Sequence, residues 1–258
     1  MTQLRGMDAC VYQWERYPKG HKYQYRPVME RPVDFSKLHD INFAWVRAIT
    51  IDGYPDYAFE ENWAGFKSRG VPRGAYGFSN QADPVGFAKR MFNIVQATGD
   101  IGELPPWLDF ECRYIEATKS YVGKMDWNAA RLWLQATEVF WKKRPIIYTS
   151  YSMWFNPPPP WTAEYDVAVA SYTAVNGQPK WMPRGFPTWK FWQQGTPAIG
   201  KAQGFRSEEI DIDVFNGDVV SFNRAFNIVT TPTPDRLDQL GTRVTELERL
   251  VSNHINKI

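Results

Sequence analysis

Residues 104–111 read LPPWLDFE, and this stretch decides the fold. Two prolines end whatever element comes before it, and the tryptophan, leucine and phenylalanine that follow favour a β-strand. Because side chains alternate along a strand, Asp109 and Glu111 share one face and Phe110 takes the other. Two acids at the carboxyl end of an apolar strand are costly unless they are used or paired. The stretch therefore predicts a buried strand that presents two carboxyl groups.

This pair of acids has two interpretations. Two close carboxylates push the pKa of one group up, so that one carboxyl stays protonated as a general acid while its neighbour stays ionised. A D-x-E sequence at a strand end is also common as a structural or metal-binding pair. The remainder of the chain has to distinguish these interpretations.

Strand-like and helix-like stretches alternate on both sides of this strand. Such alternation implies a parallel sheet with right-handed crossovers, and eight strands can close a barrel. Helical patterns at 34–40, 57–69, 84–97 and 126–143 fall in the first half only, and the second half is joined by loops rich in Pro and Gly. We therefore predict an α/β fold, a TIM-like (β/α) barrel with eight strands and fewer helices. The predicted strands are 4–11, 42–50, 72–79, 104–111, 145–149, 166–172, 188–193 and 210–215.

Acidic residues fall at the ends of three of these strands. Asp8 ends the first strand, Asp109 and Glu111 end the fourth, and Asp211 and Asp213 lie in the last. Because the first and last strands of a barrel are neighbours, these acids could converge on one mouth, where barrels of this kind place their active sites. A single acid at a strand end is more often a helix cap or a surface charge. Acids from three strands at one end favour a functional site.

The composition is that of an ordinary globular protein. The chain has 258 residues, of which 43% are hydrophobic and 22% charged, enough for one large domain or two small ones. The net charge of +2 gives no reason to expect a nucleic acid or a membrane as partner. The aromatic content of 16% suits a groove that stacks on sugar rings. No metal or cofactor is expected.

The ends of the chain carry different signals. The start, MTQLRGMDACVYQW, holds no apolar stretch of signal-peptide length, so we expect a chain made in the cytosol. Spacing alone does not show whether Cys10 and Cys112 form a disulfide. We divide the chain into a barrel domain at 1–229, a Thr/Pro linker at 230–236 and a heptad stalk at 237–258.

The stalk is a short coiled-coil helix of about three heptads, which is marginal on its own. It can pack back on the domain as an amphipathic helix, or join copies of the chain or a virion or tail partner. The linker before it favours the second interpretation. Its apolar seam is formed by Leu237, Leu240, Val244, Leu247, Val251, His254 and Ile258.

Six segments in order resemble glycoside hydrolase family 25, the Chalaropsis-type lysozymes. They are GMDACVYQW, DYAFEENWAGFKSRGVPRGAYGF, PPWLDFE, RPIIYTS, FWQQGT and IDIDVFNG, and the resemblance covers about residues 4–219. It implies a flattened barrel with fewer helices than strands. It also implies hydrolysis of the β-1,4 bond between N-acetylmuramic acid and N-acetylglucosamine in peptidoglycan.

The resemblance also assigns roles to residues. It implies that Glu111 is the general acid, that Asp109 is its partner carboxylate, and that Asp8 and Asp211 are supporting acids. The substrate's own acetamide can act as the nucleophile in such a scheme. The groove-lining positions that the resemblance implies are Tyr76, Tyr148, Trp192 and Gln193.

A long loop at 12–31 follows the first strand and therefore lies at the mouth of a barrel. We expect Trp14, Tyr23 and Tyr25 in this loop to stack on the glycan. The alternative is that the loop is only a mobile surface flap.

The chain departs from the family pattern at three places. Gly77 stands where His is usual, and Asp213 stands where Asn is usual. The segment RAITIDG replaces a K-A-T-E-G turn, with Arg47 and Asp52 as the nearest equivalents. The loop at 12–31 is in addition longer than usual. We expect these changes to alter the groove rather than the catalytic pair.

An active muramidase is the preferred function, since all four acids of the pattern are present. The alternatives are a non-catalytic wall-binding or virion-structural protein on the same barrel, and a glycosidase for another polysaccharide. The missing signal peptide and wall-binding repeats favour a bacteriophage lysin over a bacterial enzyme. Such a lysin acts on the bacterial cell wall after release from the host cytoplasm, or is carried in the virion.

Overall fold

The computed structural model describes most of the barrel domain. The predicted linker at 230–236, the stalk at 237–258 and most of the loop at 12–31, including Trp14, Tyr23 and Tyr25, lie outside the described residues. The described residues are 4–13, 33–78, 82–111, 113–115, 120–122, 126–150, 158–195 and 197–228.

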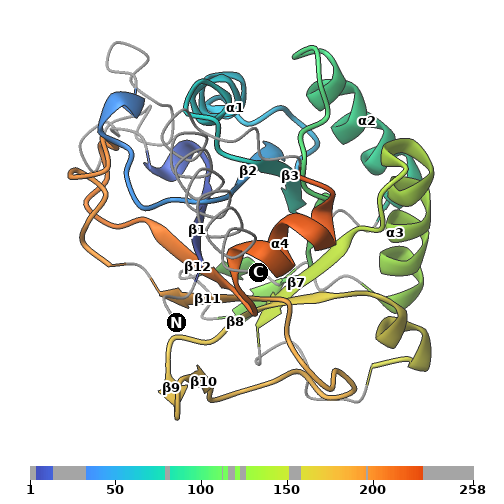
Figure 1. Cartoon of the computed structure of the whole chain (residues 1–258). Helices are drawn as coiled ribbons and strands as arrows, with labels where there is room; N and C mark the ends of the chain where they lie inside the picture. The colour runs from blue at the N-terminus through green and yellow to red at the C-terminus, as the bar shows by residue number, and fades with distance from the viewer. Residues whose placement is uncertain are drawn as a thin grey trace, which may run out of the picture.

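Eight strands close into a barrel in the order β1–β12–β11–β8–β7–β4–β3–β2, which confirms the predicted architecture (Figure 1). Two short hairpins lie outside the barrel: β5 (Arg113–Ile115) with β6 (Ser120–Val122), and β9 (Ala174–Val175) with β10 (Gln178–Pro179). The barrel strands are β1 (Arg5–Ala9), β2 (Ala44–Ile49), β3 (Arg73–Phe78), β4 (Trp107–Asp109), β7 (Ile146–Ser150), β8 (Val167–Ala170), β11 (Phe191–Gly195) and β12 (Asp211–Phe215).

The sheet is not entirely parallel, and this corrects the prediction. β12 runs antiparallel to both of its neighbours, β1 and β11, whereas the other neighbouring pairs in the barrel are parallel. A parallel neighbour needs a crossover, usually a helix, but an antiparallel one can be joined by a loop. Between β11 and β12 the described residues hold turns and no helix, so the chain re-enters the barrel at the end where it left. The start of β12, Asp211, therefore lies at the mouth.

Three helices cover the outside of the barrel on the side of the first strands (Figure 1). α1 (Phe59–Ser68), α2 (Pro84–Gln96) and α3 (Trp127–Trp141) connect β2 to β3, β3 to β4 and β4 to β7, as the sequence predicted. Asp83 and Asp126 cap α2 and α3 by accepting bonds from the backbone N–H groups of Gly86 and Ala129. The helix predicted at 34–40 is only a single 3₁₀ turn, Phe35–Lys37.

A fourth helix, α4 (Val219–Phe226), was not predicted. Asp218 and Ser221 form a capping box at its start, and eight residues were too few for a clear period in the sequence. Phe222 packs on Phe43 and Phe215 and so closes the end of the barrel away from the mouth. No helix among the described residues has both the length and the apolar composition needed to cross a membrane.

Two cores lie on opposite faces of the sheet. The outer core fills the layer between strands and helices with aliphatic side chains such as Val46 and Leu108 and with aromatic ones such as Trp63 and Trp133. The inner core fills the half of the barrel interior that lies away from the mouth, called the lower half below, and the half toward the mouth is called the upper half. The lower half is packed with aromatic rings: Trp45 stacks on Trp107 with centroids 4.0 Å apart. Among the described residues, the acidic side chains of the interior, such as Asp8 and Asp109, lie toward the mouth.

Candidate active site

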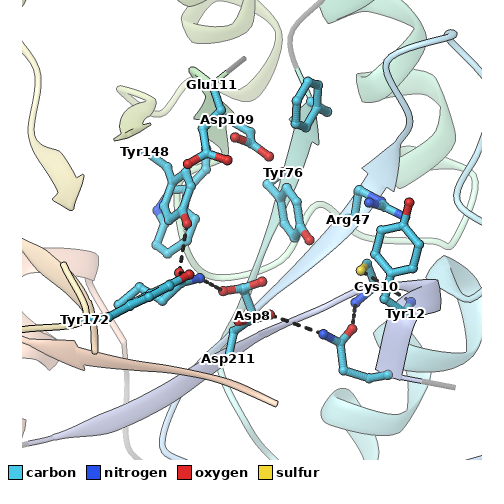
Figure 2. A pocket seen from close by; sticks show the side chains of 14 residues that line it. Asp8, Cys10, Tyr12, Arg47, Tyr76, Asp109, Glu111, Tyr148, Tyr172 and Asp211 are labelled. Atoms are coloured by element: carbon cyan, nitrogen blue, oxygen red, sulfur yellow. Dashed lines mark hydrogen bonds between the residues drawn. The ribbon is translucent and has the colours of Figure 1, made fainter. Parts of the chain in front are cut away.

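The barrel opens at the carboxyl ends of its parallel strands into a pocket, seen in Figure 2. Each of the eight strands, or the segment directly after it, contributes at least one side chain to the pocket. The lining residues are Asp8, Cys10, Tyr12, Gln13, Arg47, Tyr76, Phe78, Trp107, Asp109, Glu111, Tyr148, Tyr172, Gln193 and Asp211.

Asp109 and Glu111 enter the pocket from β4 and the residues directly after it. The backbone stays extended past the strand because Phe110 N–H donates to Tyr148 O at 2.8 Å, and Thr149 Oγ1 donates to Phe110 O at 3.0 Å. The Phe110 ring points out of the barrel and stacks on Trp127 at 4.6 Å. The two carboxyl groups therefore share the inner face, as alternation predicted, and Figure 2 shows them side by side.

Gln193 connects three other side chains of the pocket. Its Nε2 donates to Asp8 Oδ2 at 2.6 Å, and its Oε1 accepts from the hydroxyls of Tyr148 and Tyr172, each at 2.9 Å. These bonds join β1, β7, β11 and the segment after β8 across the barrel. Asp8 and the two tyrosines are thereby held in fixed orientations by one neutral amide.

Gln13 fixes the opposite side of the pocket. Its Nε2 donates to Asp211 Oδ2 at 3.2 Å, and its Oε1 accepts from the Cys10 N–H at 2.7 Å. Cys10 is a buried free thiol, and burial raises its pKa to about 12, so the thiol is protonated at neutral pH. Cys112 lies outside the described residues.

Arg47 is the only basic side chain among the described residues of the pocket wall. Its Nε and Nη2 both donate to Asp56 Oδ2 at 2.6 Å, and its guanidinium lies 4.8 Å from the centre of the Tyr12 ring. Asp56 is buried and also accepts from the Ala58 N–H at 2.9 Å. The guanidinium is therefore held rigidly at the wall, where it offers a positive charge to the carboxyl groups.

The carboxyl groups of the pocket all bind protons more tightly than free side chains do. Burial, and then the charge of Asp211, raises the pKa of Glu111 to about 7. Burial raises the pKa of Asp109; the charge of Glu111 raises it further and that of Arg47 lowers it. Burial and the nearby acids raise the pKa of Asp8, and burial raises the pKa of Asp211 to about 6. Each of these carboxyl groups therefore gives up its proton at a higher pH than a free side chain does.

The structure brings together most of the residues proposed from the sequence. Asp8, Asp109, Glu111 and Asp211 line one pocket together with the predicted groove positions Tyr76, Tyr148 and Gln193. Trp14 lies outside the described residues.

Trp192 was predicted to line the groove, and the structure corrects this prediction. It faces out of the barrel, where it is buried in the outer core and donates to Ser171 O at 2.7 Å. Because side chains alternate along β11, Gln193 and Trp192 cannot both face the groove.

The structure also corrects the prediction that glycine at position 77 alters the groove. A side chain at this position would point out of the barrel into Ile49, Phe87 and Met91, and not into the groove. The Gly77 departure from the family pattern therefore belongs to the packing between β3 and α2.

Tyr12, Gln13 and Tyr172 also line the pocket, although they were not named as site residues from the sequence. Tyr172 is two residues beyond Ala170 and four beyond Ala168, so the period of two along the predicted strand at 166–172 was a usable signal. Tyr12 and Gln13 stand in the segment GMDACVYQW, whose resemblance to the family was also a usable signal, but the 3₁₀ turn Val11–Gln13 that directs them was not predicted.

No group of three or more histidine, cysteine or acidic side chains within the described ranges is arranged to hold a metal ion. The metal-binding interpretation of the Asp109–Glu111 pair thus has no support from the other described side chains.

Paired carboxyl groups with raised pKa values at the mouth of an eight-stranded barrel place the molecule in the class of glycosidase-type barrels. The chain belongs to the glycosyl hydrolases family 25, whose family model matches residues 28–197. β1 with Asp8 and β12 with Asp211 lie outside the matched segment. The placement of these two acids therefore rests on the barrel itself.

Relatives of this family agree with the assignment. Lysozyme M1 of Streptomyces globisporus is 27% identical over 198 residues, which cover 70% of this chain and 62% of that protein. The chain thus spans about three fifths of the length of the curated relatives it matches.

Solved structures share the fold. The muramidase from Trichobolus zukalii has a TM-score of 0.62 and 19% identity, covering 86% of this chain and 98% of that one. The modular autolysin LytC from Streptococcus pneumoniae, in complex with a synthetic peptidoglycan ligand, has a TM-score of 0.62 and 16% identity, covering 82% of this chain and 46% of that one.

Proposed function

We propose that this protein is a peptidoglycan hydrolase, a β-1,4-N-acetylmuramidase that cleaves between N-acetylmuramic acid and N-acetylglucosamine. The observation that carries the proposal is the Asp109–Glu111 pair at the barrel mouth: Asp109 is buried, and Glu111 is half-buried with a pKa of about 7. The family membership and the names of its relatives support the substrate class.

Glu111 acts as the general acid in this scheme. A pKa of about 7 leaves a large share of Glu111 protonated at neutral pH, whereas an unperturbed glutamate, with a pKa of about 4.3, is ionised there. The proton goes to the glycosidic oxygen as the bond to the leaving sugar breaks. The residual carboxylate can then accept a proton from the water that completes hydrolysis.

Asp109 acts as the partner anion. Burial and the charge of Glu111 raise the pKa of Asp109. In this scheme Glu111 is protonated, so its charge no longer opposes ionisation of Asp109, and the nearby Arg47 charge favours the ionised form. A carboxylate next to the reacting carbon offsets positive charge on the sugar ring, or orients the acetamide of the substrate for attack. The rigid contact between Arg47 and Asp56 holds the positive charge of Arg47 in one place throughout the reaction.

The remaining lining residues hold the glycan. Tyr12 and Tyr172 are 46% and 65% exposed, so their rings are available to stack on sugars at the rim. The bonds from Gln193 to Asp8, Tyr148 and Tyr172 fix the floor of the pocket before substrate arrives. Preorganised polar groups of this kind lower the cost of ordering the site at the moment of reaction.

Digestion of purified peptidoglycan tests the proposal. The products are reduced with borohydride and hydrolysed, and the sugar at the new reducing ends is identified. Reduced muramic acid is the expected result, and reduced glucosamine would contradict the bond assignment. Binding to walls without new reducing ends would favour a non-catalytic wall-binding or virion-structural protein. Cleavage of a different polysaccharide would favour a glycosidase with another substrate.

We further propose that residues 237–258 associate with copies of themselves. The heptad pattern supports this, with Val244 and Val251 at a positions and Leu240 and Leu247 at d positions. Light scattering on the full chain and on a protein truncated after Thr230 tests it across a wide concentration range. Equal monomeric masses for both proteins would contradict self-association and leave a virion or tail partner, or packing on the domain.

A further inference from the structure

Asp213 places a carboxyl group inside the barrel and leaves it without a partner. Its side chain is completely buried, and neither Oδ1 nor Oδ2 has a hydrogen-bond partner among the described residues. Its neighbours in β12, Ile212 and Val214, belong to the outer core, so alternation directs Asp213 inward. Asp213 does not line the pocket, but lies one inward position deeper than Asp211.

The neighbouring strands supply nothing that neutralises this carboxyl group. Across β1 it pairs with Gly6, which has no side chain, and across β11 it pairs with Gln193. A side chain at position 6 would collide with the Phe43 ring, so the aromatic core packs directly against β1 there. Gln193 is the nearest polar side chain in the register, and its amide group is already bonded to Asp8.

The titratable groups that face Asp213 from other strands are mostly acids and phenols. Those that interact with its charge are Asp8 of β1, Asp211 of β12 itself and Tyr172 after β8, while β8 contributes only alanines to the interior. The one cation of the pocket wall is Arg47 of β2, and its guanidinium is bound to Asp56.

An ionised, unpaired carboxylate among aromatic rings and other acids has a prohibitive solvation cost, so the group remains protonated. Burial, followed by the charge of Asp211, raises the pKa of Asp213 well above that of a free aspartate, in agreement with the geometry. A protonated carboxyl is neutral and close in shape to an amide.

We propose that Asp213 is a positioning residue that stays protonated while the site works, and that its neutral carboxyl leaves the Gln193 amide bound to Asp8. An ionised Asp213 would attract the Gln193 Nε2 hydrogens toward the barrel interior and repel Asp8 and Asp211. The Gln193 bonds to Asp8, Tyr148 and Tyr172 would then weaken together. The proton on Asp213 thus keeps the floor of the pocket in its working arrangement.

Carboxyl-carbon NMR of aspartate-labelled wild-type protein tests the protonation directly, without any substrate. Asp8 and Asp109 also have raised pKa values, so the Asp213 signal is the one that is missing in Asp213→Asn. In wild type this signal is expected to remain that of a protonated carboxyl from acidic to neutral pH. The Gln193 side-chain amide signals should not move in that range. An Asp213 signal that titrates near the ordinary value of about 3.9 would overturn the proposal.

Unfolding measured against pH gives a second, independent test. A folded-state pKa raised above the unfolded value lowers wild-type stability as pH rises from about 4 toward the folded pKa. The folding constant of Asp213→Asn, divided by that of wild type, should therefore rise by up to about tenfold per pH unit above pH 4. Asp40→Asn, an exposed change, is the matched control and should follow wild type. Parallel curves for wild type and Asp213→Asn would overturn the proposal.

The activity test rests on the proposed function. Because asparagine is a neutral replacement, Asp213→Asn should retain wild-type wall hydrolysis and an unshifted acid limb of the pH–rate profile. A folded but inactive variant, or an acid limb moved to lower pH by removal of a negative charge, would overturn the proposal. If Asp213→Asn does not fold, the NMR titration of the wild-type protein decides whether Asp213 is protonated. If wild type hydrolyses no wall at all, the proposed function fails, while the NMR and unfolding experiments still decide the state of Asp213.

Discussion

The two halves of the barrel interior are similarly buried but are filled in opposite ways. The lower half is packed with rings, including Phe43, Trp45 and Phe191, which contact one another at centroid distances of 4.6 to 5.6 Å. The upper half holds acids such as Asp8 and Asp109, whose burial is unfavourable for their charged forms. The lower half can therefore contribute apolar packing to stability, while the upper half carries the chemistry at a cost in stability.

The difference shows how one scaffold serves both needs. Alternation along each strand sends every second side chain inward, and the level along the barrel axis decides whether that side chain meets rings or acids. Substitutions in the upper half should change activity while preserving the fold. Substitutions in the lower half should lower the stability of the fold and have less effect on activity. Four changes test this division, given from the largest expected effect to the smallest.

Glu111→Gln should reduce wall hydrolysis by about a hundredfold to ten-thousandfold, because the amide cannot donate the catalytic proton. The turnover of purified wall by the folded variant is the measurement, and wild-type turnover would contradict the assignment of Glu111.

The same variant should be more stable than wild type at neutral pH. The folded-state pKa of Glu111 is about 7, above the unfolded value of about 4.3, so its destabilising effect develops as pH rises between these values. Denaturant unfolding at pH 4 and pH 7 measures this. The two proteins should differ little at pH 4 and clearly at pH 7.

Phe191→Ala should lower the free energy of unfolding by about 3–5 kcal/mol, because Phe191 is fully buried and the cavity left behind is lined by rings. Its ring contacts those of Trp45, Phe43 and Phe215 at 4.6, 5.3 and 5.4 Å. Phe191→Leu is the matched control and should lose less. Urea unfolding measures both, and a folded Phe191→Ala with strongly reduced activity but wild-type stability would break the division between the halves.

Asp109→Asn should reduce wall hydrolysis on the order of a hundredfold, since the partner anion is lost. Removal of this negative charge also lowers the pKa of Glu111, which then loses its proton at a lower pH. The alkaline limb of the residual pH–rate profile should therefore move to lower pH. An unchanged limb would mean that the two carboxyl groups do not interact.

Tyr172→Phe should have the smallest effect, a loss of activity of about fivefold, which corresponds to one hydrogen bond worth about 1 kcal/mol. The Tyr172 hydroxyl donates to Gln193 Oε1, but the Tyr148 hydroxyl donates to the same atom, so Gln193 stays oriented. Steady-state kinetics on soluble wall fragments measure the loss. A loss as large as that of Glu111→Gln would show that the rim takes part in the chemistry.

Much of the fold could be predicted because its signals are local. Apolar runs bounded by Pro and Gly marked the barrel strands, and Asp83 followed by Pro84 marked the start of α2. The direction of β12 could not be predicted, because loop residues between two strands do not state whether the chain crosses the barrel or turns back. The short helix α4 was missed for a similar reason: Phe222 is explained in part by its packing on Phe43, which is far away in the sequence.

The sequence by itself determined which residues carry the acids of the site and, through the period of two in β4, that Asp109 and Glu111 share a face. The tertiary structure decided the surroundings of those acids and therefore their protonation states. Closure of the barrel buries them, brings Arg47 from β2 near Asp109, and lets one amide at Gln193 connect Asp8 with two tyrosines. Protonation depends on solvation and on charges several strands away, and these become defined only when the strands are packed together.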